Sequence, residues 1–429
     1  LIDQHVETAV RNAGIERAKA QAEAVELYRI LRLPNPEQIG QRYPHQVSGG
    51  QLQRVMTAMA MACHPDLIIF DEPTTALDVT TQIEVLVAIR DAVKTYGSAA
   101  LYISHDLAVV AQMADRIMVL RHGKLVEEAD TRTMLDAPQQ DYTRSLWAVR
   151  SLRTEPKPCP PQATPLLEVR KASASYGHQP VLHDVSLKLY RGQTLAVIGE
   201  SGSGKSSTAR LITGLLPPTS GQVLYDGKAL PADYRQRSKE QLRRLQMIYQ
   251  IPDTALNPRQ RIVDIIGRPL SFYLGLKGQA LRQRVAELLE MIELDPALYM
   301  DRQPRELSGG QKQRICIARA LAAEPQLIIC DEVTSALDQL VAEGVLKLLN
   351  RIQQQLGVAY LFITHDVATV RAIADEVLVM QRGKVVDHGC REEIFTPPYR
   401  DYTGLLFSSE PEMDPDWLDH LLEKRALVS

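Results

Sequence analysis

Short apolar runs and alternating apolar–polar segments recur along the chain and predict strands of a sheet. Residues 185–189 alternate between apolar and polar side chains, which is typical of a half-buried strand. Residues 194–198, 326–330 and 360–364 are short, mostly apolar runs, which are typical of buried strands in a parallel sheet. Other segments have apolar residues at helical spacing, so the pattern as a whole predicts an α/β fold.

The predicted helices lie between and after these runs. Residues 207–216 follow the run at 194–198, and residues 278–294 form a longer amphipathic stretch whose counterpart is 15–33. The final segment, 410–429, is acidic and then helical in pattern. We interpret it as a surface appendage with no assignable chemistry.

Four short motifs occur twice, and each second occurrence follows the first by the same 260 residues (308 minus 48, and likewise for the others). These motifs are Ser-Gly-Gly-Gln at 48–51 and 308–311, Asp-Glu at 71–72 and 331–332, Ala-Leu-Asp at 76–78 and 336–338, and His-Asp at 105–106 and 365–366. The repeat predicts two copies of one domain.

The boundary between the copies is a proline-rich linker at 150–165, which cannot continue a helix. The first copy then covers 1–149 and the second 166–409. Residue 1 corresponds to about residue 261, so the first copy has no counterpart of roughly 165–260. Because the chain begins with Leu rather than Met, we expect a fragment of a longer protein. A degenerate first copy is the alternative.

Composition narrows the class of protein. The net charge is −3, from 49 basic and 52 acidic residues, so the chain lacks the excess of basic residues expected of a nucleic-acid-binding protein. The sequence contains no run of about 18 apolar residues, the length needed to span a membrane. No secretory signal is visible. The scattered cysteines, which form no C-x-x-C pair, indicate reduced thiols in a cytosolic protein. We expect no metal site at the isolated pair Cys63-His64.

One segment, 199–206, fits the pattern G-x-x-x-x-G-K-[ST] and predicts a phosphate-binding loop between a buried strand and a helix. Its glycines let successive backbone N–H groups face a phosphate, and the helix N-terminus adds a favourable dipole. We expect Lys205 to reach the β- and γ-phosphates and Ser206 to bind Mg²⁺. The predicted nucleotide contacts of this loop are Gly199, Glu200, Ser201, Gly202, Ser203, Gly204, Lys205, Ser206 and Ser207.

Polar residues at the ends of the two later strands predict the remaining chemistry of an ATPase site. Asp331 follows an apolar strand and is placed to hold Mg²⁺. Glu332 is the candidate base that orients or deprotonates the attacking water. His365 ends the next strand and could contact the γ-phosphate. Its recurrence at 105 in the same setting favours that role over a purely structural one.

These residues resemble the ATP-binding cassette (ABC) transporter ATPases over nearly the whole chain. Leu307 to Gln311 matches the family's signature, and Ser335 to Asp338 matches its D-loop. The resemblance implies that Gln250 is the Q-loop glutamine, with a part in catalysis and Mg²⁺ binding, and that Tyr176 stacks on adenine. It also implies two nucleotide-binding domains with helical subdomains, the first without its P-loop portion.

The first copy matches the family from its signature onwards. Val47 to Gln51 is its signature, Glu72 its catalytic acid and His105 its switch histidine. In the family, ATP lies between the P-loop of one cassette and the signature of the other. The resemblance therefore implies that the first copy contributes to the nucleotide site at Lys205 through Ser48, Gly49, Gly50 and Asp78.

Branch and partners also come from the resemblance. Ala255 to Arg259, and the repeated Asp-Tyr-Thr at 141–143 and 401–403, resemble the oligopeptide, dipeptide, nickel and glutathione importer branch. The branch implies two permease subunits, a solute-binding protein outside the membrane, and a peripheral position on the cytoplasmic face. With only Cys159 near this tail, we expect no iron–sulfur centre. A small departure is Val333, where the family usually has the proline found at Pro73.

Two other classes of function stay open. One is a ribosome-associated tandem cassette, although those proteins usually carry a long charged linker. The other is a cassette of a phosphonate-degrading enzyme complex. Co-purification with permeases, ribosomes or a lyase core would distinguish the three. The transported compound is not predicted, because these ATPases do not line the path of the substrate.

Overall fold

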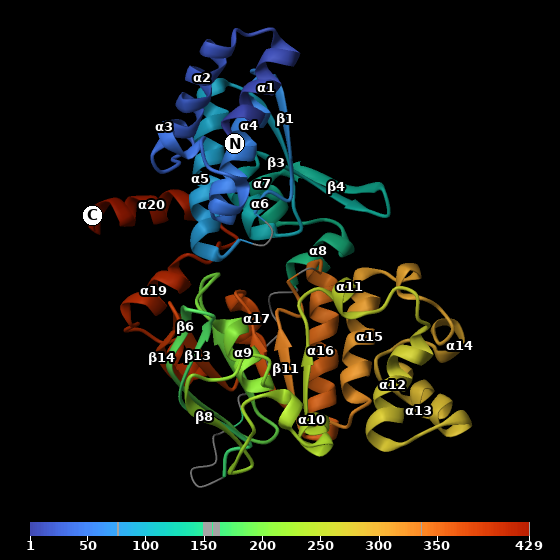
Figure 1. The fold of residues 1–429 in the computed structure, drawn as a ribbon. Coiled ribbons are helices and arrows are strands. Elements are labelled where there is room, and N and C mark those ends of the chain that lie inside the picture. The colour runs from blue at the N-terminus through green and yellow to red at the C-terminus, as the bar shows by residue number, and fades with distance from the viewer. Residues whose placement is uncertain (75–76, 149–156, 158–163, 336, 429) are drawn as a thin grey trace. The chain divides into compact units, whose positions relative to one another are not determined.

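The computed structural model describes the chain except for residues 75–76, 149–156, 158–163, 336 and 429. It divides the chain into two compact units (Figure 1). The first unit contains residues 1–148 and 405–429, and the second contains residues 149–404. The segment 410–429, which we interpreted as an appendage after the second copy, therefore lies within the unit of the first copy.

The second unit is built on a six-stranded sheet with the order β10-β11-β12-β7-β13-β14. All neighbours are parallel except the pair β13 and β14. The strands are β7 (Thr194–Ile198), β10 (Leu245–Ile248), β11 (Leu327–Asp331), β12 (Ala359–Ile363), β13 (Glu376–Gln381) and β14 (Lys384–Cys390). The apolar runs at 194–198, 326–330 and 360–364 thus form three adjacent strands, as the α/β prediction requires.

Both faces of this sheet are buried at its adjacent strands β11, β12 and β7, which explains why these three strands are mostly apolar. Ile328 and Cys330 contribute to a core with the helical part of the unit, whereas Leu327 and Ile329 contribute to a core on the other face. That second core includes the helix α9 (Lys205–Thr213) and a four-stranded antiparallel sheet in the order β6-β5-β8-β9. The strands of this sheet are β5 (Leu167–Tyr176), β6 (Gln179–Leu189), β8 (Ser220–Tyr225) and β9 (Lys228–Ala229).

Helices make up the rest of the second unit. The predicted helix at 278–294 is α13, which ends at Met291. The helices of the unit besides α9 are α10 (Lys239–Arg244), α11 (Pro252–Ala255), α12 (Ile262–Leu274), α13 (Gly278–Met291), α14 (Pro296–Tyr299), α15 (Gly309–Leu321), α16 (Gln339–Leu356), α17 (Val367–Ile373), α18 (Arg391–Ile394) and the start of α19 (Asp401–Ser408).

The first unit repeats part of this architecture. Its strands are β1 (Leu67–Asp71) and β2 (Ala99–Ile103), which are parallel, and β3 (Arg116–Arg121) and β4 (Lys124–Asp130), which are antiparallel. Its helices are α1 (Ile2–Ala13), α2 (Arg17–Ile30), α3 (Pro36–Ile39), α4 (Gly49–Met61), α5 (Val79–Tyr96), α6 (Leu107–Met113), α7 (Thr131–Asp136), α8 (Asp141–Ala148) and, from the end of the chain, α20 (Trp417–Val428).

The two copies differ most in how one sheet face is covered. Six apolar residues of the first unit are exposed: Leu67, Ile69, Leu101, Ile103, Met118 and Leu120. The residues 260 positions later are all buried in the core that contains β7 and α9: Leu327, Ile329, Leu361, Ile363, Leu378 and Met380. Among the described residues of the first unit, no strand or helix covers this face.

This contrast predicts different costs for the same substitution. Ile329→Ala removes methyl groups from a side chain that is 0% exposed, so it should destabilise the second unit by about 2–5 kcal/mol. Ile69 is 59% exposed, so Ile69→Ala should change stability by no more than about 0.5 kcal/mol. Native-state hydrogen exchange of the amides in β11 and β1 measures each effect locally. Equal costs would contradict the assigned burial.

Candidate nucleotide site

The predicted phosphate-binding loop lies between β7 and α9, and its backbone has the conformation that the glycines permit. Gly199, with φ of 146°, and Gly204, with φ of 106°, both lie in the region that favours glycine. A Cβ on Gly199 would lie 2.2 Å from the carbonyl oxygen of Met380 in β13. The first glycine is therefore needed for close packing against the neighbouring strand as well as for the turn.

Lys205 begins α9 and is buried inside this loop. Its Nζ donates hydrogen bonds to the carbonyl oxygens of Gly199, at 2.8 Å, and Glu200, at 2.9 Å. Ser203 Oγ is buried and has no hydrogen-bond partner among the described residues. A lysine ammonium held by the loop and an unsatisfied hydroxyl match the donors that a phosphate group would need.

The hydroxyl and the carboxylate predicted to bind Mg²⁺ are in contact. Ser206 Oγ donates a hydrogen bond of 3.0 Å to Asp331 Oδ1, which joins the first turn of α9 to the end of β11. Burial raises the pKa of Asp331, an effect that the Ser206 hydrogen bond partly offsets. Oxygen ligands of this kind fit Mg²⁺, which usually takes one or two carboxylates plus water and phosphate oxygens.

Glu332 lies between two polar side chains from neighbouring segments. Gln250 Nε2 donates a hydrogen bond of 2.7 Å to Glu332 Oε2, and His365 Nδ1 lies 3.4 Å from Glu332 Oε1. Burial alone would raise the pKa of Glu332, but the hydrogen bond and charge of His365 outweigh it and lower the pKa. Glu332 is therefore held ionised, as a base must be.

The backbone at this glutamate is unusual. Glu332 has φ of 50°, in the left-handed region that few residues other than glycine adopt. Glu72 in the first unit has φ of 48°, and its Oε1 lies 2.7 Å from Nδ1 of His105. The same strained turn and the same Glu–His pair thus occur in both copies, as is common for backbone strain at functional sites.

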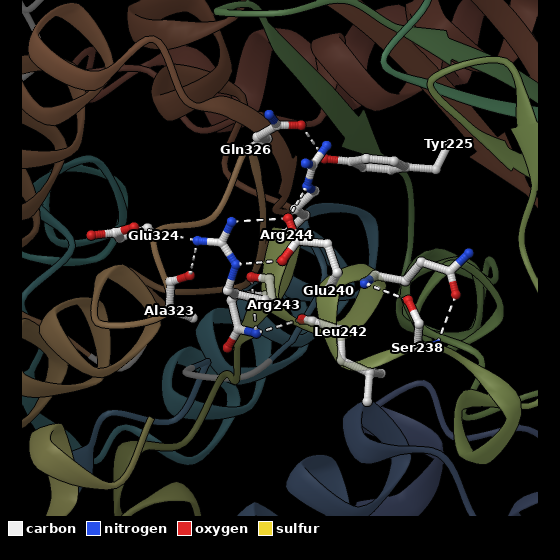
Figure 2. A network of polar contacts seen from close by, with 11 residues as sticks. Tyr225, Ser238, Glu240, Leu242, Arg243, Arg244, Ala323, Glu324 and Gln326 are labelled. Carbon is white, nitrogen blue, oxygen red and sulfur yellow. Dashed lines mark hydrogen bonds and ion pairs between the residues drawn. The ribbon is translucent and has the colours of Figure 1, made fainter. Parts of the chain in front are cut away.

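The strand that leads to Gln250 is fixed by a polar network at its other end (Figure 2). Glu240 of α10 accepts hydrogen bonds from Arg243 at 2.8 and 2.9 Å and from Arg244 at 2.6 Å, and these bonds lower the pKa of Glu240 to about 2. The carbonyl of Arg244 accepts a bond of 2.9 Å from the Gln326 amide, just before β11. The network sets the start of β10 against β11 and so positions the segment that carries Gln250.

Tyr176 lies at the end of β5, 43% exposed, and its hydroxyl accepts a hydrogen bond of 3.0 Å from Arg210 Nη1. Arg210 is in α9, so the ring is held beside the helix that begins at Lys205. Arg210 was not among the predicted residues, although its place one turn after Ser206 could have suggested it. Tyr402, also missed, contacts the loop itself, because its hydroxyl accepts a hydrogen bond of 3.1 Å from the backbone amide of Glu200.

The two signature segments cap helices in the same way. Ser308 Oγ accepts from the Gln311 amide at 3.3 Å, and Ser48 Oγ accepts from the Gln51 amide at 3.3 Å. A Cβ on Gly50 would lie 2.2 Å from Cγ2 of Thr81, so this glycine allows α4 to pack against α5. Asp78 accepts from the Thr81 amide at 3.0 Å and caps α5. Of the two D-loops, residues 75–76 and 336 lie outside the described residues.

The second unit therefore brings one set of predicted residues to the carboxyl ends of its parallel strands: the loop 199–206, Gln250, Asp331, Glu332 and His365. The predicted residues Ser48, Gly49, Gly50 and Asp78 lie in the first unit. In the described part of the chain, no group of three or more His, Cys, Asp or Glu side chains could hold a metal ion, and no helix is long and apolar enough to cross a membrane. Cys159 lies outside the described residues.

A glycine loop at a helix N-terminus, with an acid, a base and a histidine at adjacent strand ends, defines a P-loop ATPase site. A sequence profile of the ABC transporter family matches residues 2–75 and 182–335. The glutathione import ATP-binding proteins GsiA of Pectobacterium atrosepticum and Escherichia coli K12 are 36% and 38% identical to this chain. Each alignment covers 96% of this chain and 72% of the relative.

Solved structures agree with the sequence comparison. The structure of cbiO1 from Clostridium perfringens, described as part of the ABC transporter complex cbiONQ, aligns with a TM-score of 0.50 and 28% identity. That alignment covers 54% of this chain and 91% of cbiO1. The chain belongs to the ABC transporter ATP-binding family, and it is an ATPase of the oligopeptide and glutathione importer branch.

The roles of two residues can be separated by substitution. Glu332→Gln keeps the size and hydrogen bonding of the side chain but removes the base, so ATP should stay bound while turnover falls by at least about 100-fold. Lys205→Ala removes the charge beside the phosphates, so both ATP retention and turnover should fall. Nucleotide retention after gel filtration and phosphate release measure the two effects.

The control is Glu72→Gln, the same substitution in the first copy. Glu72 has a histidine partner as Glu332 has, but it lies in the first unit and is not among the residues gathered around the loop 199–206 of the second unit. Turnover should therefore stay within about twofold of wild type. Fast hydrolysis by Glu332→Gln, or equal loss in both variants, would contradict the assignment of Glu332 as the base.

Proposed function

We propose that the chain is the ATP-binding and hydrolysing subunit of an importer that takes up peptides or similar small solutes. The observation that carries this proposal is the likeness to two proteins named as glutathione import ATP-binding proteins, which extends over both copies of the repeat. A ribosome-associated factor or a component of a phosphonate-lyase complex has no such support.

The residues of the second unit divide the chemistry among them. Lys205 and the amides of 199–206 hold the phosphates, with Tyr176 against the adenine. Ser206, Asp331 and Gln250 hold Mg²⁺, which neutralises charge on the phosphate oxygens when it is bound. Glu332 accepts a proton from the attacking water, and His365 keeps Glu332 ionised and faces the γ-phosphate. Gln250, bonded to Glu332, can report the state of the site to the segment that follows it.

The site at Lys205 also needs groups from the first cassette. We infer that Ser48, Gly49 and Gly50 close over the γ-phosphate, since the capped N-terminus of α4 offers backbone N–H groups and a favourable dipole. Asp78 adds a D-loop contact. The pairing is head to tail, so the signature at Ser308 faces away from the P-loop of its own cassette.

The surface after Gln250 is suited to a membrane partner. Ile251 is 50% exposed, and Asn257 and Arg259 are also exposed further along this segment. We propose that this surface, up to Leu270, docks on cytoplasmic loops of two permease subunits. The chain would then lie peripherally on the cytoplasmic face of the membrane, and a solute-binding protein would deliver the solute from the other side.

Purification from native membranes tests the importer function. A tagged Glu332→Gln variant, held in its ATP-bound state, should co-purify from detergent-solubilised membranes with two permease subunits, because ATP binding completes the docking surface. Mass spectrometry identifies the partners. The matched control is Lys205→Ala, which should recover less permease. Recovery of ribosomal proteins or a lyase core in place of permeases would refute the proposal.

A second test addresses the pairing of cassettes. Ser48→Arg places a bulky cation where the γ-phosphate contact belongs and should reduce ATP turnover by at least about 100-fold. Ser308→Arg removes the same helix cap, which costs about 1 kcal/mol, but should leave turnover nearly unchanged in monomeric fractions. The second variant therefore controls for the loss of the cap. If Ser308→Arg is the inactive variant, the intramolecular pairing is wrong.

A further inference from the structure

The end of the chain packs against the first cassette through contacts that only this cassette can make. Residues 410–429 follow the second cassette in sequence but belong, together with 405–409, to the first unit. We propose that a face formed by α5, α6 and α7 is a binding surface for the segment 410–428. Through it, the second cassette is fastened to the first whether or not nucleotide is bound. We call this segment the clasp.

Polar contacts fix the clasp at its start. Gln112 of α6 is 6% exposed, and its Nε2 donates to the carbonyl oxygens of Glu412, at 2.9 Å, and Asp414, at 2.5 Å. The Oε1 of the same side chain accepts from the amide of Leu418 at 3.0 Å. One buried amide side chain thus satisfies three backbone groups of the clasp, which is a specific arrangement and not a loose surface contact.

Two arginines of the first cassette bind carboxylates of the clasp. Arg132 Nη2 lies 2.8 Å from both oxygens of Asp416, and Arg90 Nη1 lies 2.8 Å from Asp419. Such exposed pairs add little affinity, but they fix orientation. They also give a role to the acidic composition of this segment.

Apolar burial accounts for most of the binding. Trp417, Leu418 and Leu421 of α20 are at most 9% exposed. They pack in one cluster with four apolar residues of α5 and α6: Ile83, Leu86, Val87 and Val109. Burial of three large side chains on a continuous apolar face is enough for stable docking.

The second cassette lacks this surface. At the positions 260 residues later, Ile83 and Val87 are replaced by Glu343 and Lys347, which form an ion pair of 2.6 Å on α16. The polar contact residues differ as well, because Gln112, Arg90 and Arg132 correspond to Ala372, Asn350 and Glu392. Leu86 keeps its counterpart in Leu346. Two otherwise similar helices therefore present an apolar face in one copy and a charged face in the other, and the clasp can bind only the first cassette.

The clasp does not depend on which solute is transported, so its test is separate from that of the importer function. A protease site replaces residues 158–163 in the full chain, and the linker is cut in nucleotide-free buffer containing a chelator. The two pieces should then elute together in gel filtration. After the double substitution Ile83→Glu and Val87→Lys, they should elute apart. This variant copies the surface of α16, so α5 keeps an i,i+4 pair that supports its fold.

A charge swap tests the contact directly. Arg132→Asp should weaken association of the cut pieces by about fivefold, and the added substitution Asp416→Arg should restore it. Lys347→Ala in the second cassette is the control and should change nothing. In uncut protein, hydrogen exchange of the amides of residues 420–424 should speed up at least tenfold in the Ile83→Glu, Val87→Lys variant, which provides a readout even if the cut pieces aggregate.

Three results would overturn the proposal. The first is separation of the cut wild-type pieces. The second is unchanged co-elution and exchange in the Ile83→Glu, Val87→Lys variant. The third is an uncut wild-type protein that elutes as a dimer and becomes monomeric on Arg132→Asp, because the clasp would then bind a second copy of the chain.

Discussion

The site depends on the parallel register of three strands. Because β11 pairs with β12 and β12 pairs with β7, Asp331 lies opposite Ile363, and Ile363 lies opposite Val197. Each strand therefore ends at the site: β11 leads into Glu332, β12 leads into the segment with His365, and β7 leads into the phosphate loop. A one-residue slip would turn each of these side chains to the other face. Burial of both sheet faces prevents that slip, so the apolar cores determine where the catalytic groups lie.

Comparison with the first copy indicates which contacts of the site form without the phosphate loop and α9. Glu72 and His105 are in contact, and Glu72 has nearly the same positive φ as Glu332. In the second unit β7 lies between β12 and β13 in the sheet, whereas the described part of the first unit has no counterpart of β7 between β2 and β3. The Glu–His pair therefore needs only the register of two adjacent strands. The contact between a serine hydroxyl and the acid at the end of β11 needs α9 as well, and that contact is found in the second unit.

Patterns in the sequence predicted the local elements and the motifs, because strands, glycine turns and helix caps depend on residues close together in the chain. The strand at 194–198 and the helix after it were predicted within a few residues. Ser206 and Asp331 were each predicted to bind Mg²⁺, but the hydrogen bond between them was not itself predicted. Contacts between distant residues could not be predicted. Arg210 with Tyr176, Tyr402 with Glu200, and Gln112 with Asp414 each join segments whose proximity depends on the complete fold. The packing of Gly50 against Thr81 was also not predicted, because the phosphate contact expected of that glycine carries no information about the packing between helices.

The second cassette has an attachment point at each end of its sequence. Before it, the backbone amide of Lys157 donates to Asp375 at 2.7 Å, and its Nζ donates to the Gly192 carbonyl at 2.7 Å and to Gln353 at 2.6 Å. The linker is therefore attached to the second cassette at Lys157. After it, the clasp returns the chain to the first cassette. In our proposal the clasp gives the two cassettes a second connection besides the linker, and a second connection raises the effective concentration of one cassette at the other. A site that takes its P-loop from one cassette and its signature from the other would gain from this directly, since less of the free energy of ATP binding is needed to bring the two together.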